Sequence, residues 1–265
     1  MQTIINGNLI GFEDGGTGAP ILLIHGFPLN RTMWRPQREA LQAAGFRPVI
    51  PDLRGFGESG TSEGTTIASY VDDLIGLLDY LDIEKATVAG MSMGGYILLD
   101  LLDRHPERCS AACFVVTRSG ADDEAGKARR QALARDTQTL GPQVAADAFA
   151  RILFAPGTEE TSPRLAQEVY GWMAGTPTLG LVGGLLAMRE RKDYTPVLRS
   201  VQVPSLVIGA EQDQAIPPEN SRLLAQELPD ATLCMIPGAG HMVNLEQPEA
   251  FNSCLLQFLK RLPAA

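Results

Sequence analysis

The sequence predicts an α/β fold, in which a mostly parallel, doubly wound β-sheet carries an inserted block of helices. The first observation is a series of continuous apolar runs, which are typical of strands buried on both faces of a parallel sheet. These runs are "APILLIHG", "FRPVIPD", "ATVAGMS", "AACFVVT", "PSLVIGA" and "ATLCMIPG". The second observation is that helical patterns lie between these runs. The third is one long stretch, from about 118 to 199, that has helical patterns and no convincing strand.

The chain begins with a pattern unlike that of the later strands. "TIING" and "LIGFED" are short alternating runs separated by a glycine turn. Apolar alternation with a period of two, interrupted by a short turn, favours two antiparallel strands. We therefore expect a hairpin at the N-terminus, with the parallel part of the sheet after it.

Three helices of the core are predicted from their apolar periodicity. In "TTIASYVDDLIGLLDYLDI", apolar residues recur at alternating spacings of four and three from Ile67 to Leu81, and either of the two leading threonines can cap the helix. "MGGYILLDLLDRHPE" predicts a well-buried helix that ends near His105, because the residue before Pro106 disfavours helical angles. "QPEAFNSCLLQFLKRL" predicts a final amphipathic helix.

The long helical stretch breaks the alternation of strands and helices. We expect several helices in it, split near Gly141-Pro142, Pro156-Gly157 and Pro177. An insertion of this size between two sheet strands predicts a cap over the C-terminal edge of the sheet. The predicted organisation is one discontinuous α/β core, residues 1–117 and 200–265, with a helical cap at 118–199.

The charge of the chain excludes some classes of partner. The 265 residues carry a formal net charge of −9, and an acidic surface repels phosphate groups, so nucleic acid and anionic membranes are not expected partners. The densest basic run, "KARR" at 127–130, is interpreted as a solvated helix face. The apolar runs are too short and too interrupted to insert into a membrane.

The N-terminus shows no basic segment followed by an apolar run, so no secretory signal is predicted and the expected location is cytoplasmic. The four cysteines show no metal-binding spacing. In a reducing compartment they are expected to be reduced, buried thiols. They are Cys109, Cys113, Cys234 and Cys254.

A candidate nucleophile lies in "VAGMSMGGYILLD", where Ser92 has glycines two residues before and two residues after it. Taken alone, G-x-S-x-G is a weak motif. Here it stands between a predicted buried strand and a predicted helix, the context of a nucleophile elbow. The turn is so sharp that side chains do not fit at Gly90 and Gly94, and the N–H groups of the following helix favour developing negative charge. The alternative is a tight turn without catalytic function.

A serine nucleophile needs a base, and the chain has only three histidines. His105 closes the predicted helix that follows Ser92, and it is interpreted as a helix end at the surface. His25 lies far upstream, directly after a strand. His241, in "PGAGHMVNLE", follows the last predicted strand at the sheet edge where sites collect, and the order Ser, acid, His also makes it the expected base.

The acid that orients the histidine is expected on a loop between Ser92 and His241. Asp213 follows the strand "PSLVIGA" and is the preferred candidate, whereas the nearby Glu211 is interpreted as a surface charge. Asp122 and Asp123, just after an earlier strand, remain a second option.

The oxyanion formed during attack needs two N–H donors, one of them from the residue after the nucleophile, Met93. The other is expected from the loop "HGFPLN", where the N–H of Phe27 is the candidate. His25 then has a structural role, which is to hold this loop through its ring nitrogens.

Four segments together resemble the α/β-hydrolase superfamily, in particular its small bacterial esterases, enol-lactonases and cofactor-free haloperoxidases. They are "LLIHGFPLNRTMW", "PDLRGFGESG", "VAGMSMGGY" and "PGAGHMVNLEQPEAF". The resemblance covers nearly the whole chain except the cap. It implies Ser92 as nucleophile, Asp213 as acid and His241 as base, with Phe27 and Met93 as oxyanion donors. Asp52 and Arg54 match a structural loop of the superfamily.

The resemblance implies a serine hydrolase that cleaves carboxylic esters of small to medium acyl chain, or lactones, through an acyl-enzyme, without metal or organic cofactor. Cap residues that could line the substrate pocket are Phe149, Phe154, Trp172 and Met188, although each could equally serve packing. An apolar cap suits a small-molecule ester and does not suit a polyanion. The expected assembly is a monomer or homodimer.

Two other functions stay open at this stage. One is perhydrolysis, the reaction of the cofactor-free haloperoxidases; those relatives usually carry Trp after the His-Gly pair, where this chain has Phe27. The other is a ligand sensor that keeps the triad and turns over slowly.

Overall fold

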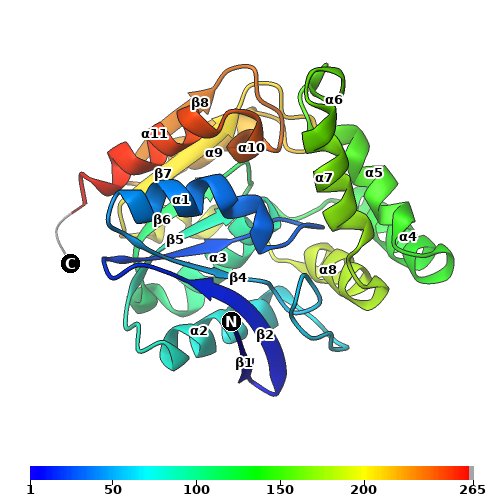
Figure 1. The fold of residues 1–265 in the computed structure, drawn as a ribbon, viewed down its shortest axis with the longest axis horizontal. Helices are drawn as coiled ribbons and strands as arrows, with labels where there is room; N and C mark the ends of the chain where they lie inside the picture. Colours follow the sequence, from blue (N-terminus) through cyan, green and yellow to red (C-terminus); the bar gives the residue numbers. More distant parts are fainter. Residues whose placement is uncertain (263–265) are drawn as a thin grey trace.

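The computed structural model describes residues 1–262, which form an eight-stranded sheet with helices on both faces (Figure 1). The strand order is β1-β2-β4-β3-β5-β6-β7-β8, and every pair from β4 to β8 is parallel. The strands are β1 Gln2–Ile5, β2 Asn8–Asp14, β3 Pro20–Ile24, β4 Arg47–Pro51, β5 Ala86–Met91, β6 Cys109–Val115, β7 Ser205–Ala210 and β8 Ala231–Ile236. The predicted α/β class, with a mostly parallel sheet, is therefore confirmed.

The N-terminal hairpin has the predicted antiparallel arrangement. Ile5 pairs with Asn8 across a two-residue turn, and both turn residues, Asn6 and Gly7, have positive φ angles of 49° and 78°. Positive φ at both positions is what a tight hairpin turn requires, and Asn-Gly satisfies it. β2 then pairs antiparallel with β4, which joins the hairpin to the parallel strands.

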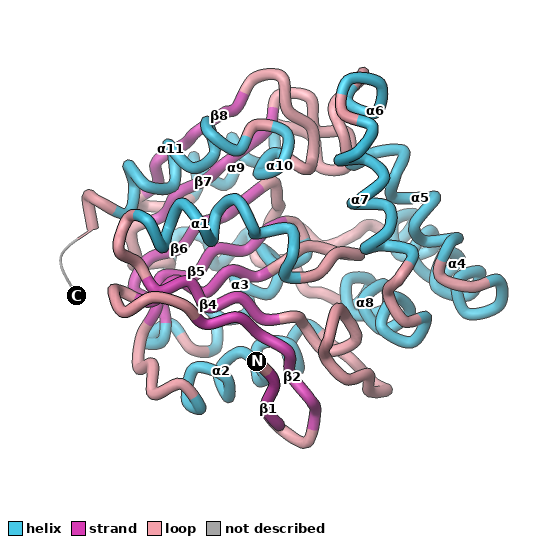
Figure 2. The backbone as a smooth tube through the Cα atoms, in the orientation of Figure 1, coloured by secondary structure: helices cyan, strands magenta, loops and turns pink. Residues whose placement is uncertain are grey.

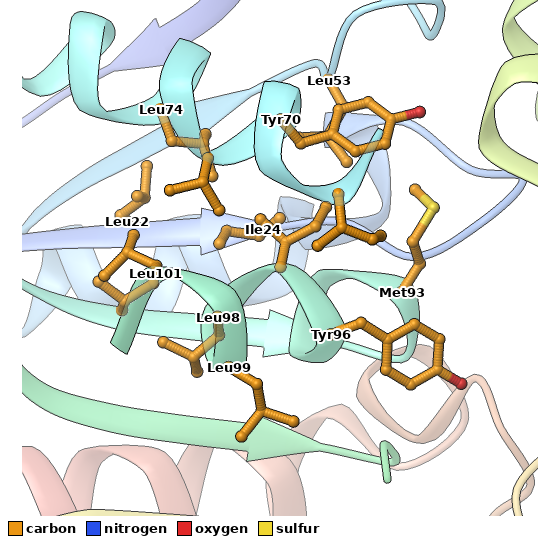
Figure 3. Packing of buried hydrophobic residues seen from close by; sticks show 14 of the residues in the cluster. Leu22, Ile24, Leu53, Tyr70, Leu74, Met93, Tyr96, Leu98, Leu99 and Leu101 are labelled. Carbon is orange, nitrogen blue, oxygen red and sulfur yellow. The ribbon is translucent and has the colours of Figure 1, made fainter. Parts of the chain in front are cut away.

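Two buried clusters lie on the two faces of the sheet, as a doubly wound fold requires. One contains the apolar faces of α2 Ile67–Tyr80, α3 Met93–Arg104 and α9 Glu219–Glu227. The other contains the preceding turn η1 Arg31–Trp34 with α1 Arg35–Ala43, and α11 Pro248–Leu259. Figure 3 shows part of the first cluster, whose members include Leu74 of α2, Leu98 of α3, and Leu22 and Ile24 of β3.

The core helices begin and end near the predicted residues. Thr66 caps α2 by accepting a hydrogen bond from the Ser69 N–H, and the Ser69 hydroxyl accepts one from the Thr66 N–H in return. α3 ends at Arg104, one residue before the predicted stop, and Pro106 begins the short turn η2 Pro106–Arg108. A further short helix, α10 Val243–Glu246, precedes α11.

Between β6 and β7 the chain forms helices and no strand. We call α4–α8 the inserted helices; Figure 2 shows them at one end of the sheet. They are α4 Glu124–Leu140, α5 Gln143–Leu153, α6 Thr158–Thr161, α7 Pro163–Ala174 and α8 Thr178–Glu190, and η3 Thr195–Ser200 leads on to β7. The three predicted breaks fall between helices. α8 lies so close to the loop after β4 that a Cβ added at Gly180 would overlap the Gly55 carbonyl.

The expectation of four reduced cysteines is wrong for one pair. Cys234 of β8 and Cys254 of α11 form a disulfide, with Cα atoms 6.5 Å apart, within the usual range for such a bond. They are 20 residues apart in sequence and meet because α11 packs across β8. Cys109 and Cys113 are free and buried, as predicted. No helix within residues 1–262 is long and apolar enough to cross a membrane.

Candidate active site

Ser92 occupies the sharp turn between β5 and α3, with φ 53° and ψ −112°. A positive φ is unusual for a residue with a Cβ and marks local backbone strain. The turn permits no side chain at its flanks, because a Cβ at Gly90 would overlap the Gly94 carbonyl and a Cβ at Gly94 would overlap the Ile24 carbonyl. Two hydrogen bonds hold the turn: Ser92 N–H donates to Val115 O at 2.9 Å, and Thr117 Oγ1 donates to Ser92 O at 2.8 Å.

His241 and Asp213 form a buried pair, with His241 Nδ1 2.8 Å from Asp213 Oδ2. The other carboxylate oxygen of Asp213 accepts the N–H groups of Ala215 and Ile216 at 2.8 and 2.9 Å. The carboxylate is therefore fixed in orientation. An ionised carboxylate is an acceptor, so His241 carries its proton on Nδ1 and leaves Nε2 free to accept another.

Ser92 and His241 line one cavity of about 340 Å³, although they lie far apart in the sequence. Ser92 follows β5, at the centre of the sheet, and His241 follows β8, at its edge. Both lie beyond the carboxyl ends of parallel strands, where parallel sheets place their binding sites. The cavity thus brings together a strained serine and a histidine that is oriented by a carboxylate.

The loop that carries Phe27 lies directly against the serine. A Cβ added at Gly26 would stand 3.3 Å from the Cβ of Ser92. Among residues 1–262, the N–H groups of Phe27 and Met93 have no hydrogen-bond acceptor in the chain. The Phe27 ring lines the cavity and meets the Phe149 ring edge-on, at a centroid distance of 5.0 Å.

His25 has the structural role that was predicted for it. The Leu53 N–H donates to His25 Nε2 at 3.0 Å, so the ring proton is on Nδ1, which donates to Gly26 O at 2.9 Å. Burial lowers the pKa of His25, which keeps the imidazole neutral. His25 therefore connects the loop after β3 to the loop after β4 and has no free nitrogen with which to act as a base.

The alternative acids have other partners. Asp122 contacts Arg118, Arg130 and Arg191. Burial alone would raise its pKa, but the hydrogen bonds and charges of Arg191 and Arg130 outweigh burial and lower the pKa to about 2. Asp123 caps α4, where its Oδ1 accepts the Gly126 N–H at 2.7 Å. Neither carboxylate contacts His241.

The predicted pocket residues divide into two pairs. Phe149 of α5 and Met188 of α8 line the cavity. Phe154, just after α5, is buried against the loop that carries His241, where a Cβ at Gly240 would overlap its carbonyl carbon. Trp172 of α7 packs against the buried cluster on the α1 and α11 face. These last two side chains do not line the cavity.

Glu246 is a residue that the sequence analysis missed. Its Oε1 accepts the Gly240 N–H at 2.9 Å, and its Oε2 accepts the Ala155 N–H and the Thr158 hydroxyl, each at 2.9 Å. It therefore connects the loop that carries His241 to the inserted helices. Burial raises its pKa. The only sequence signal was a carboxylate five residues after the histidine.

The polar part of the cavity wall was also missed. Arg118, Asp122, Arg129 and Arg130 line the cavity together with Tyr96 of α3. Two of these arginines belong to the basic run that was interpreted as a solvated helix face. Arg129 is exposed, as that interpretation requires, but the side chain of Arg130 is only 18% exposed and lies against Asp122.

Comparison with known proteins agrees with the fold. The family described as the alpha/beta hydrolase fold matches residues 19–248 of the chain. The chain belongs to this family of hydrolases. Among solved structures, a thermophilic esterase from Thermogutta terrifontis in its malate-bound form superposes with a TM-score of 0.94 at 34% identity, over 98% of this chain and 97% of that one.

Two further relatives carry different activities in their names. The enol-lactonase from Burkholderia xenovorans LB400 superposes with a TM-score of 0.92 at 28% identity, over 98% of this chain and all of that one. Non-heme chloroperoxidase CPO-A1 from Kitasatospora aureofaciens is 30% identical over 277 aligned positions, which cover 98% of each protein. The esterase, the enol-lactonase and the chloroperoxidase are thus all similar to this chain, although their names give different activities.

Proposed function

We propose that this protein is a serine hydrolase of carboxylic esters with small to medium acyl chains, lactones included. Ser92 is the nucleophile, His241 the base and Asp213 the acid. The observation that carries the proposal is the buried pair of His241 and Asp213, 2.8 Å apart, on the same cavity as a serine with positive φ. The Thermogutta esterase and the Burkholderia enol-lactonase support the same reaction class.

The proposed reaction has two steps. His241 Nε2 takes the Ser92 proton as the hydroxyl oxygen attacks the ester carbonyl, and Asp213 stabilises the imidazolium that forms. The tetrahedral intermediate collapses, the alcohol leaves with the proton from His241, and an acyl-enzyme remains. Water then attacks the acyl carbonyl while His241 accepts its proton. The second tetrahedral intermediate collapses, the bond from the acyl carbon to Ser92 Oγ breaks, His241 returns the proton to that oxygen, and the acid leaves.

The oxyanion of both steps would be bound by the N–H groups of Phe27 and Met93. The lack of another acceptor for either group within residues 1–262 supports this role. Met93 is the first residue of α3, so its N–H belongs to the unsatisfied N-terminal turn of a helix. Each donor of this kind contributes about 3 kcal/mol to transition-state stabilisation.

The inserted helices would select the substrate. We propose that residues 118–199 form a cap on a core made of 1–117 and 200–265, with Phe149 and Met188 as its contacts to the substrate. A cavity of about 340 Å³ suits a small molecule. The cytoplasmic location and the monomeric or homodimeric state stay predictions of the sequence.

Perhydrolysis is the second candidate, favoured by the full-length similarity to the Kitasatospora chloroperoxidase. Hydrogen peroxide would replace water at the acyl-enzyme, so that its oxygen attacks the acyl carbonyl, a peracid leaves and the Ser92 hydroxyl is restored. Assaying peracid formation from acetate esters with added peroxide would separate the two activities.

The first test is hydrolysis of p-nitrophenyl esters from acetate to decanoate by the wild type and by Ser92→Ala. We expect the variant to lose at least a factor of about 10³ in kcat. Ser110→Ala, which changes an exposed serine on β6, is the matched control and should keep full activity. Full activity of Ser92→Ala would refute the proposed function.

A further inference from the structure

One side of the active-site cavity is cationic, although the protein as a whole carries a net charge of −9. Arg118 comes from the loop after β6, and Arg129 and Arg130 come from α4. Asp122 is the one carboxylate among the described residues that line the cavity. Guanidinium groups on a concave wall of low dielectric attract anions to that wall, whatever the net charge of the chain.

The carboxylate of Asp122 does not neutralise this wall. Its two oxygens accept hydrogen bonds from three guanidinium groups: those of Arg118, Arg130 and the buried Arg191. Three positive charges against one negative charge leave a net charge of +2. Donors also outnumber acceptors, since within residues 1–262 the Nε atoms of Arg118 and Arg191 are buried without a hydrogen-bond partner.

Arg129 differs from its neighbours because no described residue pairs with it. Residues 1–262 contain no salt bridge or side-chain hydrogen bond to its guanidinium, whereas Arg130 beside it is bound to Asp122. The side chain of Arg129 is exposed at the cavity and is therefore available to a ligand. Free guanidinium groups bind carboxylates through two parallel hydrogen bonds.

We infer that the natural substrate is an ester or lactone that also bears a carboxylate, and that Arg129 binds this carboxylate while Ser92 attacks the ester. The inference rests on the proposed function for its reaction. Arg118 and Arg130 add positive electrostatic potential to the cavity wall, and both donate hydrogen bonds to the Asp122 carboxylate. The substrate thus carries one negative charge, a property that the small-molecule ester expected from the sequence did not specify.

The test compares substrates that differ by one negative charge. Monomethyl esters of succinic, glutaric and adipic acid are compared with their dimethyl esters by initial rates in a pH-stat. Because the carboxylate could belong to the alcohol portion, 4-acetoxybenzoate is compared with 4-acetoxyacetophenone as well. We expect the wild type to favour the anionic member of at least one pair by about tenfold in kcat/KM, the usual effect of one charge-assisted hydrogen bond.

Arg129→Gln should remove this preference by lowering kcat/KM for the anionic member about tenfold, while the neutral member changes less than about twofold. Arg135→Gln is the matched control, since it removes the same charge from an exposed side chain of the same helix, outside the cavity lining. Arg129 has no salt-bridge partner among residues 1–262 to lose, so its variant should fold as the wild type does.

A binding measurement makes the result independent of turnover. Calorimetry with glutarate should give a Kd about tenfold higher for Arg129→Gln than for the wild type and Arg135→Gln. Equal glutarate binding by all three proteins, or preference for the neutral member in every pair, overturns the inference. If neutral esters still require Ser92 in that case, only the inference fails. If no ester requires Ser92, the proposed function fails.

Discussion

Replacing Asp213 by Asn tests the role of the buried pair most directly, because the change keeps the shape and removes the charge. Asp213 Oδ1 accepts two backbone N–H groups, so the carbonyl oxygen of Asn takes that place. The amide NH₂ then faces His241 Nδ1, and two donors cannot face each other. The imidazole must move its proton to Nε2, the atom that has to accept the Ser92 proton. We expect kcat to fall about 10⁴-fold, or about 5 kcal/mol.

The assay is p-nitrophenyl butyrate hydrolysis, with Glu211→Gln as the control. Glu211 is an exposed carboxylate two residues away, so its variant makes the same chemical change outside the pair. It should keep kcat within about twofold. If Asp213→Asn kept more than a tenth of the wild-type kcat while folded, the tautomer argument would be wrong and another group would orient His241.

Two further predictions concern the cavity wall. Arginine side chains lower the pKa of Asp122 to about 2. A carboxyl group whose pKa is lower in the folded protein than in the unfolded protein stabilises the fold at pH values above the unfolded pKa. This stabilisation is lost as the pH falls toward the pKa of the folded protein. Asp122→Asn should therefore lose about 2 kcal/mol of unfolding free energy at pH 7 in urea titrations. This deficit should shrink toward pH 2, and a deficit independent of pH would contradict it. Phe149→Ala should move the optimum of the p-nitrophenyl ester series to longer acyl chains, because it removes a ring from the wall. Trp172→Ala should leave the optimum in place, and an equal shift in both would show that the cavity has another boundary.

The parts of the site that could be predicted are those whose requirements are local. The turn at Ser92 needs glycine at positions 90 and 94 because backbone atoms within a few residues occupy the space of a side chain. The apolar runs predict the parallel strands because such strands are buried on both faces, and β5 and β7 are buried along their whole length. His241 followed from the small number of histidines and from their order along the chain.

The direction of side chains on the inserted helices could not be predicted in this way. α5 contacts both α4 and α7, so its apolar residues have two neighbours to face. Phe149 turns toward the Phe27 ring and the cavity, whereas Phe154, just after the end of α5, is buried in the cluster on the α1 and α11 face. Periodicity defines a buried face, but it does not say which element covers that face.

Contacts between residues far apart in the sequence could not be predicted from the sequence either. Arg191 reaches Asp122 across 69 residues, and no pattern in the sequence indicates that these two side chains meet. Cys234 and Cys254 are not in a recognisable spacing, and only the packing of α11 against β8 brings them together. In both cases the pairing depends on how complete elements are placed in the fold.

The contacts of Glu246 restrict how the inserted helices of this protein can be exchanged for those of a relative. Of its three donors, the Ala155 N–H belongs to the segment that joins α5 and α6, the Thr158 hydroxyl belongs to the first residue of α6, and the third is the N–H of the residue before His241. Transplanting helices from a relative to change substrate preference would also replace Thr158, whose hydroxyl holds Glu246 and with it the histidine loop. A successful chimera must therefore keep residues 155–158 from the recipient, or exchange position 246 together with the helices.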